Sequence, residues 1–319
     1  MTLMTLVASF AVLVAVGVVL ALITHAAATR RERAVAAAFP PLGRIITVNG
    51  HRLHVLTKGT GPDLILLHGA SGNLRDLTPL IDLLAPDYRV TVFDRPGLGW
   101  SDPIPDGTSL TAQARHLATA AAELGITSPI LVGLSFGGTV SLAWALYADL
   151  KPRALVLVSS PALPWPGKLD PWYRLTKTAL GKHVAIPLVA AFVPASYVSA
   201  TVTGIFAPDP VPATYRSYVG EGLAIRRQAL HANTAQVNAL RAAIVAQSAD
   251  YQSLTLPIEL IHGTADTIVP LTVHSGPLSA LLPHATLTVL DGAGHMPHHS
   301  QPDVILAAIA RADQLSRLR

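Results

Sequence analysis

Short runs of apolar residues recur along most of the chain, and they alternate with stretches in which the apolar residues have helical spacing. The runs are rich in Val, Leu and Ile and are expected to be strands, over residues 44–48, 53–57, 63–67, 89–93, 129–134, 154–159, 256–261 and 286–290. Helices are expected over residues 74–84, 110–124, 136–148, 273–282 and 303–315. This alternation predicts an α/β fold with βαβ units and a mainly parallel sheet buried on both faces. Asn49-Gly50 separates the first two runs and predicts an antiparallel hairpin at one edge.

Residues 161–249 interrupt the alternation. They contain Trp165, Trp172, Phe192, Phe206 and many prolines. An insertion of this size is too long for an ordinary loop, so we expect a few helices covering the strand ends. They are either simple structural cover or a lid whose apolar side shapes a substrate pocket.

The N-terminal segment has a different pattern, because no charged residue precedes Arg30 and residues 3–28 are almost entirely apolar. As a helix they would extend about 39 Å, against a hydrocarbon core of about 30 Å, and they lack the polar stripe of a soluble helix. We therefore predict a transmembrane anchor over residues 1–29, a linker over residues 30–43 and a globular domain over residues 44–319. A cleaved signal peptide stays open as an alternative, because Ala26-Ala27-Ala28 resembles a cleavage site.

Three arginines directly follow the apolar run: Arg30, Arg31 and Arg33. Positive residues beside a membrane span stay in the cytoplasm. The globular domain is therefore expected to face the cytoplasm.

Composition narrows the functional classes. Of the 319 residues, 50% are hydrophobic and 13% are charged, whereas soluble domains carry about 25% charged residues. A disordered or collagen-like protein is excluded. The chain has no cysteine, which excludes thiol nucleophiles and thiolate zinc sites. The net charge of +4 forms no long basic block, so no nucleic-acid partner is expected. Nothing in the sequence predicts the oligomeric state.

A candidate nucleophile lies in Gly133-Leu134-Ser135-Phe136-Gly137, between an expected strand and an expected helix. A sharp strand-to-helix turn exposes the middle side chain, and it needs small flanking residues. A serine hydroxyl requires a base to become a nucleophile, and histidine is the side chain best suited to this near neutral pH.

The candidate base is His295, in the loop after the last strand, and the candidate acid is Asp266, in the loop after the penultimate strand. The carboxyl ends of parallel strands are where open α/β sheets place their sites. Asp266 alone could equally be a turn or capping residue. His298 and His299 lie close to His295, but without clear acidic ligands we interpret them as a weak surface cluster rather than a metal site.

An oxyanion hole completes the expected site. The backbone N–H groups of Ala70 and Phe136 are the candidate donors. Gly69 and Gly72 permit a close approach of the backbone, and His68 is expected to have a structural role in the loop.

From about Arg44 to the end, the chain resembles the α/β-hydrolase superfamily, in particular its serine-dependent esterase-like and haloperoxidase-like members. Besides the Ser135 motif, the segment 94–102 (Asp-Arg-Pro-Gly-Leu-Gly-Trp-Ser-Asp) resembles the D-x-P-G-x-G-x-S segment of such proteins, and Gly294-His295 matches their base loop. The resemblance implies an eight-stranded, mostly parallel sheet with helices on both faces, and a structural role for Asp94. Ser135 stands where epoxide hydrolases and haloalkane dehalogenases carry an aspartate, and Ser300 stands where many members carry a glutamate.

We therefore expect acyl transfer to water. Ser135 attacks an ester-type carbonyl, His295 takes its proton and Asp266 orients His295, with no metal or organic cofactor. The apolar insertion and the anchor suggest a small hydrophobic acyl substrate. Hydrolysis of a C–C bond, perhydrolysis and acyl transfer to an alcohol would use the same three residues, and fold does not choose among them. A non-catalytic ligand-binding protein or membrane scaffold is the alternative from another class.

Overall fold

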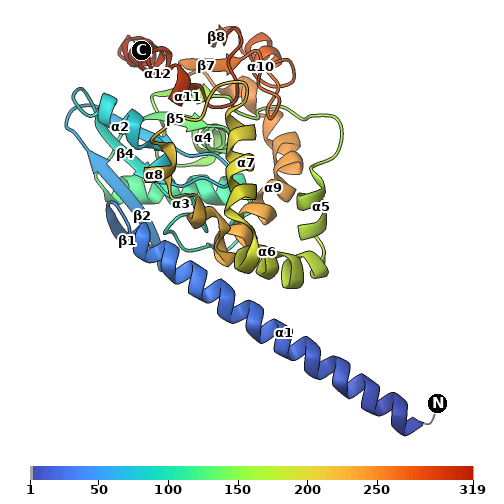
Figure 1. Cartoon of the computed structure of the whole chain (residues 1–319). Coiled ribbons are helices and arrows are strands. Elements are labelled where there is room, and N and C mark those ends of the chain that lie inside the picture. Colours follow the sequence, from blue (N-terminus) through green and yellow to red (C-terminus); the bar gives the residue numbers. More distant parts are fainter. Residues whose placement is uncertain (1–2, 319) are drawn as a thin grey trace.

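An eight-stranded sheet forms the centre of the molecule in the computed structural model, which describes residues 3–318 (Figure 1). The strand order is β1-β2-β4-β3-β5-β6-β7-β8. The strands are β1 (Arg44–Val48), β2 (His51–Lys58), β3 (Asp63–Leu67), β4 (Arg89–Phe93), β5 (Ile130–Leu134), β6 (Ala154–Val158), β7 (Ile258–Gly263) and β8 (Thr286–Leu290). The β1–β2 and β2–β4 pairs are antiparallel, and the other neighbours are parallel.

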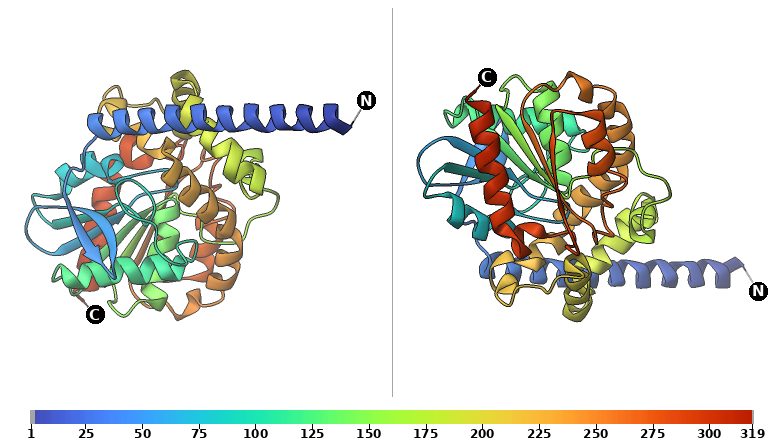
Figure 2. Two further views of the ribbon diagram at one scale, coloured as in Figure 1. Left: turned by 90° about the horizontal axis from the view of Figure 1, so that it is seen from below. Right: turned by 90° about the horizontal axis from the view of Figure 1, so that it is seen from above.

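Helices cover both faces of the sheet (Figure 2). Because side chains alternate across a strand, Ile65 and Leu67 of β3 pack into one apolar core, whereas Leu64 and Leu66 pack into the other. The first core includes residues of α3 (Leu110–Glu123), α4 (Phe136–Tyr147) and α10 (Ser275–Leu281), and the second includes residues of α2 (Thr78–Leu84) and α12 (Pro302–Ser316). Both faces of the sheet are therefore buried against apolar side chains, as the continuous apolar runs predict.

The N-terminal segment is one long helix, α1 (Leu3–Ala38), which projects from the body (Figure 1). It is long and apolar enough to cross a membrane. The helix passes the expected end of the anchor at residue 29 and includes most of the expected linker. The reason is local: residues 30–38 contain no Gly or Pro, and the first helix breakers are Pro40 and Pro41.

The insertion between β6 and β7 is helical. Its elements are α5 (Pro171–Thr176), a π-helical turn η2 (Gly181–Ala185), α6 (Ile186–Phe192), α7 (Ala195–Phe206), α8 (Tyr215–Val219), η3 (Glu221–Ile225) and α9 (Arg227–Ser248). The segment from η2 through α6 meets α7 at an angle of 100°. Three short helices complete the fold: η1 (Leu74–Leu77), η4 (Tyr251–Ser253) and α11 (Pro297–Ser300).

Candidate active site

Ser135 occupies the sharp turn between β5 and α4. Its backbone has φ 49° and ψ −123°, a conformation that a residue with a side chain rarely adopts. The flanking glycines make this turn possible, because a Cβ on Gly133 would overlap the Cα of Gly138, and a Cβ on Gly137 would overlap the carbonyl oxygen of Leu67. Their spacing in the sequence therefore follows from close backbone packing at the turn.

The three candidate residues lie in one hydrogen-bonded line. The Ser135 hydroxyl lies 3.1 Å from Nε2 of His295, and Nδ1 of His295 lies 2.8 Å from Oδ2 of Asp266. His295 and Asp266 are both buried. The loops after β5, β7 and β8 thus bring together side chains that are up to 160 positions apart.

Asp266 is held from two sides. Its Oδ1 accepts hydrogen bonds from the backbone N–H groups of Ile268 and Val269, both at 2.9 Å, while Oδ2 faces His295. Burial alone would raise the pKa of Asp266, but hydrogen bonds from His262 and His295 hold it well below its usual value. The residue is therefore both a turn aspartate and an ionised partner for the imidazole, so the two interpretations from the sequence are compatible.

His262, at the end of β7, is a neighbour of Asp266 that the sequence pattern does not reveal. Its Nε2 donates to the carbonyl oxygen of Val269 at 2.6 Å and lies 3.3 Å from Oδ2 of Asp266. Its Nδ1 then accepts from the Ser275 hydroxyl at 2.7 Å. The only available signal was its position four residues before Asp266, which by itself indicates no contact.

The candidate oxyanion donors lie beside Ser135. Phe136 begins α4, so its N–H has no acceptor within the helix. A Cβ on Gly69 would lie 3.2 Å from the Cβ of Ser135, which places the loop that continues into Ala70 against the candidate nucleophile. Both predicted donors are thus on segments that border the Ser135 side chain.

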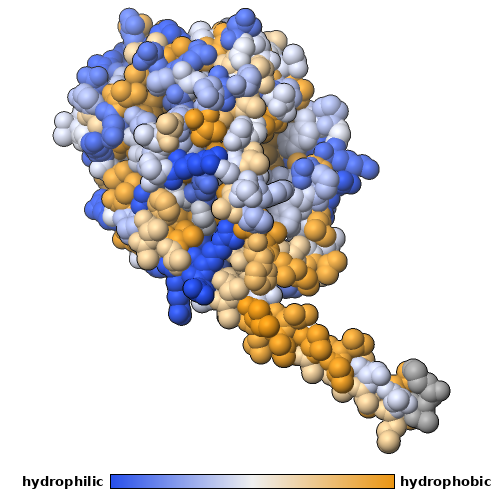
Figure 3. All heavy atoms as spheres, in the orientation of Figure 1, coloured by the Kyte–Doolittle hydropathy of each residue, from blue (hydrophilic) through white to orange (hydrophobic). Residues whose placement is uncertain are grey.

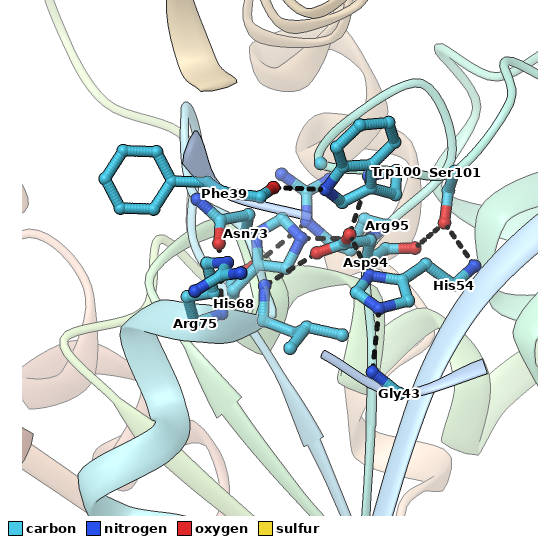
Figure 4. Close-up of polar contacts among 12 residues, drawn as sticks. Phe39, Gly43, His54, His68, Asn73, Arg75, Asp94, Arg95, Trp100 and Ser101 are labelled. Carbon is cyan, nitrogen blue, oxygen red and sulfur yellow. Dashed lines mark hydrogen bonds and ion pairs between the residues drawn. The ribbon is translucent and has the colours of Figure 1, made fainter. Parts of the chain in front are cut away.

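The fully buried side chain of Arg95 supports the loop of His68 and Gly69 (Figure 4). The guanidinium of Arg95 donates to the carbonyl oxygens of His68 and Gly69, both at 3.0 Å, and lies over the ring of Phe136 at 4.2 Å. Nε2 of His68 accepts the backbone N–H of Arg95 at 2.9 Å. Burial and the nearby Arg95 lower the pKa of His68 to about 4, so its imidazole is neutral near pH 7. These contacts fit the structural role expected for His68. They also show that Arg95 supports this loop, a role that the sequence pattern does not indicate.

Asp94 organises the loop after β4 (Figure 4). Its carboxylate lies 2.6 Å from Nδ1 of His54 and accepts the backbone N–H groups of Leu74 and Trp100 at 2.6 and 2.7 Å. Gly99 has φ +49°, and a Cβ there would overlap this carboxylate. The second glycine of the D-x-P-G-x-G-x-S segment, Gly99, therefore leaves room for the carboxylate of Asp94.

Replacing Gly99 with alanine should consequently destabilise the fold far more than a matched change at Gly125. Both glycines have positive φ, but no atom of the described residues, its two chain neighbours aside, lies within 4 Å of a Cβ on Gly125. Gly125→Ala should cost about 1–2 kcal/mol from backbone strain alone, and Gly99→Ala more than about 3 kcal/mol because the Asp94 network must also move. Thermal unfolding of both full-length variants measures the difference, and equal losses would contradict the overlap.

His298 and His299 are not the weak surface cluster that the sequence suggested, because both imidazoles are largely buried. The fold places a carboxylate beside them, that of Asp76 in η1. It lies 3.4 Å from Nε2 of His298 and 3.0 Å from Nε2 of His299. The same carboxylate accepts a hydrogen bond from the Tyr215 hydroxyl at 3.0 Å. Burial lowers the pKa of His298 to about 4. Asp76, His298 and His299 lie close enough together to hold a metal ion. His295 faces Ser135 instead.

Comparisons with known proteins agree with this fold. A family model described as alpha/beta hydrolase fold matches residues 62–302. The chain belongs to the alpha/beta hydrolase fold family. The predicted fold class is thereby confirmed, including the eight-stranded, mostly parallel sheet.

Several relatives of this alpha/beta hydrolase are described as hydrolases. A putative carbamate hydrolase of Cronobacter sakazakii is 30% identical over 72% of this chain and 84% of its own length. Among solved structures, an esterase from a Rhodococcus species has a TM-score of 0.65 at 20% identity, over 86% of this chain and 99% of its own. A membrane phospholipase A described as a bacterial virulence factor has a TM-score of 0.67 at 21% identity, over 98% of this chain and 99% of its own. The relatives support a hydrolase, and the structural matches support the fold.

Proposed function

We propose that this alpha/beta hydrolase is a membrane-anchored serine hydrolase that cleaves a hydrophobic carboxylic ester or a similar acyl substrate. The observation that carries the proposal is the line from the Ser135 hydroxyl to His295 and on to Asp266, with separations of 3.1 and 2.8 Å. A hydroxyl, an imidazole and a carboxylate in this order form the arrangement that activates a serine. A pure binding protein or scaffold has no need of it.

In the proposed reaction, Oγ of Ser135 attacks the carbonyl carbon while Nε2 of His295 takes the hydroxyl proton. Asp266 keeps the other proton on Nδ1 and stabilises the imidazolium. The N–H groups of Ala70 and Phe136 stabilise the tetrahedral oxyanion, which is worth about 3–4 kcal/mol per donor. Collapse transfers the proton to the leaving alcohol and leaves an acyl-serine. Water then attacks this acyl-serine with His295 as the base. The acyl–Oγ bond breaks, the carboxylic acid leaves and His295 returns the proton to Ser135, so no metal or organic cofactor is required.

The membrane placement rests on α1, which is apolar and exposed along its first 21 described residues, Leu3–Ile23. Arg30, Arg31 and Arg33 follow this stretch, so we propose a single-pass anchor with the catalytic body in the cytoplasm. Protease digestion of the body only from outside the cell would contradict this orientation.

The reaction and the substrate class are tested with p-nitrophenyl esters of increasing acyl length and the full chain in detergent. We expect kcat/KM to rise by about tenfold for every two methylene groups that the pocket buries, since each buried CH₂ is worth about 0.8 kcal/mol. A preference for acetate over all longer esters would contradict the hydrophobic substrate. Absence of turnover on every ester would contradict the proposed reaction.

A further inference from the structure

We propose that the insertion around the elbow between α6 and α7 lies against the surface of the same bilayer that α1 crosses, and that the site receives its acyl substrate from that bilayer. We call the exposed apolar side chains of this region the seating face: Leu180, Val184, Leu188, Phe192 and Tyr197. This inference rests on the proposed anchor. It adds a second membrane contact, made by the insertion.

The length of α1 that projects free of the body fixes where the membrane surface lies. Every residue from Leu3 to Ile23 is exposed, and the first buried side chains are those of Thr24 and Ala28. Twenty-one residues of helix extend about 32 Å, which matches a hydrocarbon core of about 30 Å. When this stretch fills the bilayer, the part of the body that touches α1 at Thr24 lies at the membrane surface.

The elbow is attached to α1 seven residues beyond Thr24, about 10 Å further along the helix. Nη1 of Arg31 donates to the carbonyl oxygen of Val193, between α6 and α7, at 2.8 Å. Arg227, at the start of α9, bonds the next residue of α1. Its guanidinium donates to both carboxylate oxygens of Glu32, at 2.9 and 2.7 Å, and to the hydroxyl of Thr29 at 2.9 Å. These contacts fix the insertion to the end of the anchor, so both meet the bilayer together.

The surface beside α1 has the side chains that a bilayer interface requires. Leu180 is 63% exposed, Phe192 is 53% exposed and Tyr197 is 67% exposed. Apolar side chains cluster over α6, next to the apolar helix α1 (Figure 3). Single exposed apolar residues need no explanation, but a gathering that continues an apolar anchor indicates an interaction surface.

Charge favours an anionic lipid surface as the occupant. Residues 171–206 contain no Asp or Glu, but they contain Arg174, Lys177 and Lys182. On α1, Arg33 is exposed and lines an open cavity of about 450 Å³, together with Arg226, Arg227 and the acidic Glu32. Basic side chains bordering an apolar segment are typical of helices that lie in the interface of anionic membranes.

The elbow is also connected to the candidate active site. Helix α7 has 12 residues and so extends about 18 Å. It begins at the elbow and ends beside the loop of His295, where a Cβ on Gly294 would overlap the carbonyl oxygen of Ala207 and where the Gly294 N–H donates to Asp209 at 3.0 Å. The candidate site would thus lie about the length of one short helix from the membrane surface.

The absence of cysteine allows a direct test, because each single-cysteine variant of the full chain carries one label. A nitrobenzoxadiazole probe is placed at Leu13→Cys in α1, at Leu188→Cys in the seating face and at Leu315→Cys in α12, on the far side of the body (Figure 1). Leu188 and Leu315 form a matched pair, because they are helical leucines with 43% and 44% exposure. The proteins are reconstituted in nanodiscs of phosphatidylcholine and phosphatidylglycerol, whose acyl chains are brominated near either the headgroup or the methyl end.

We expect bromine near the headgroup to quench the probe at residue 188 at least about twofold more than the probe at residue 315. If the probe at residue 13 is quenched but the probe at residue 188 behaves like that at residue 315, the seating face does not contact the membrane, whereas the anchor is supported. If residue 13 is not quenched by either lipid, the anchor itself is wrong. Thermal unfolding of each labelled protein confirms that it is folded.

Discussion

Ser135→Ala should abolish labelling by a fluorophosphonate probe and lower kcat/KM for ester hydrolysis by at least about 10⁴-fold. The change removes only the Oγ atom that lies 3.1 Å from Nε2 of His295. The methyl group of alanine retains the Cβ, so the strained turn at φ 49° has the same backbone in both proteins. The expected loss is therefore in the reaction and not in folding.

Ser253→Ala is the matched control, because Ser253 is an exposed serine whose hydroxyl, within the described residues, bonds only the carbonyl oxygen of Asp250 in its own turn. It should keep both labelling and turnover. Thermal unfolding should give the same midpoint for Ser135→Ala and the native chain. Full turnover by a folded Ser135→Ala variant would refute the proposed nucleophile.

Asp266→Asn should lower kcat by about 10⁴-fold, with KM almost unchanged. The backbone N–H groups of Ile268 and Val269 hold one side-chain oxygen, so the amide NH₂ of asparagine must take the place of Oδ2. It then faces Nδ1 of His295, which lies 2.8 Å from Oδ2. An N–H donor at that point forces the imidazole proton onto Nε2, and this tautomer cannot accept the proton of Ser135.

The same exchange also affects His262, whose Nε2–H is fixed on the carbonyl oxygen of Val269 and lies 3.3 Å from Oδ2 of Asp266. Two donors would then face each other in a buried space, so a moderate loss of stability should accompany the loss of kcat. Asp291→Asn is the control, since Asp291 is exposed in the neighbouring loop and contacts only Thr264 among the side-chain partners that the structure describes. Stopped-flow or steady-state assays of both variants separate kcat from KM, and equal activities would contradict the orienting role.

The strands and the candidate site follow from local sequence features, which explains why they were predictable. Each strand is a short apolar run, and the turn at Ser135 needs glycines at fixed offsets. His295 and Asp266 could be selected because each lies in the loop after a strand, where parallel strands place their sites. Helix α1 continues to Ala38, beyond the arginines at residues 30–33 that are typical of a membrane boundary, because residues 30–39 contain no helix breaker.

The residues around the site depended on contacts between distant segments. Arg95 supports the loop of Gly69 from 26 positions away, and Asp76 meets His299 across 223 positions. Nothing in the local pattern around His298 and His299 reveals a carboxylate, so the sequence suggested a surface cluster where the fold buries one.

The sequence by itself determined the order of strands and helices, the turn that exposes Ser135 and the apolar character of the N-terminal helix, since these depend on residues a few positions apart. Only the tertiary structure decided which side chains surround Asp266 and Asp76, how far α1 runs free of the body and which face of the insertion lies beside it. Those features depend on packing between segments that are far apart in the chain, and the free energy of such packing is not encoded in any short stretch of residues.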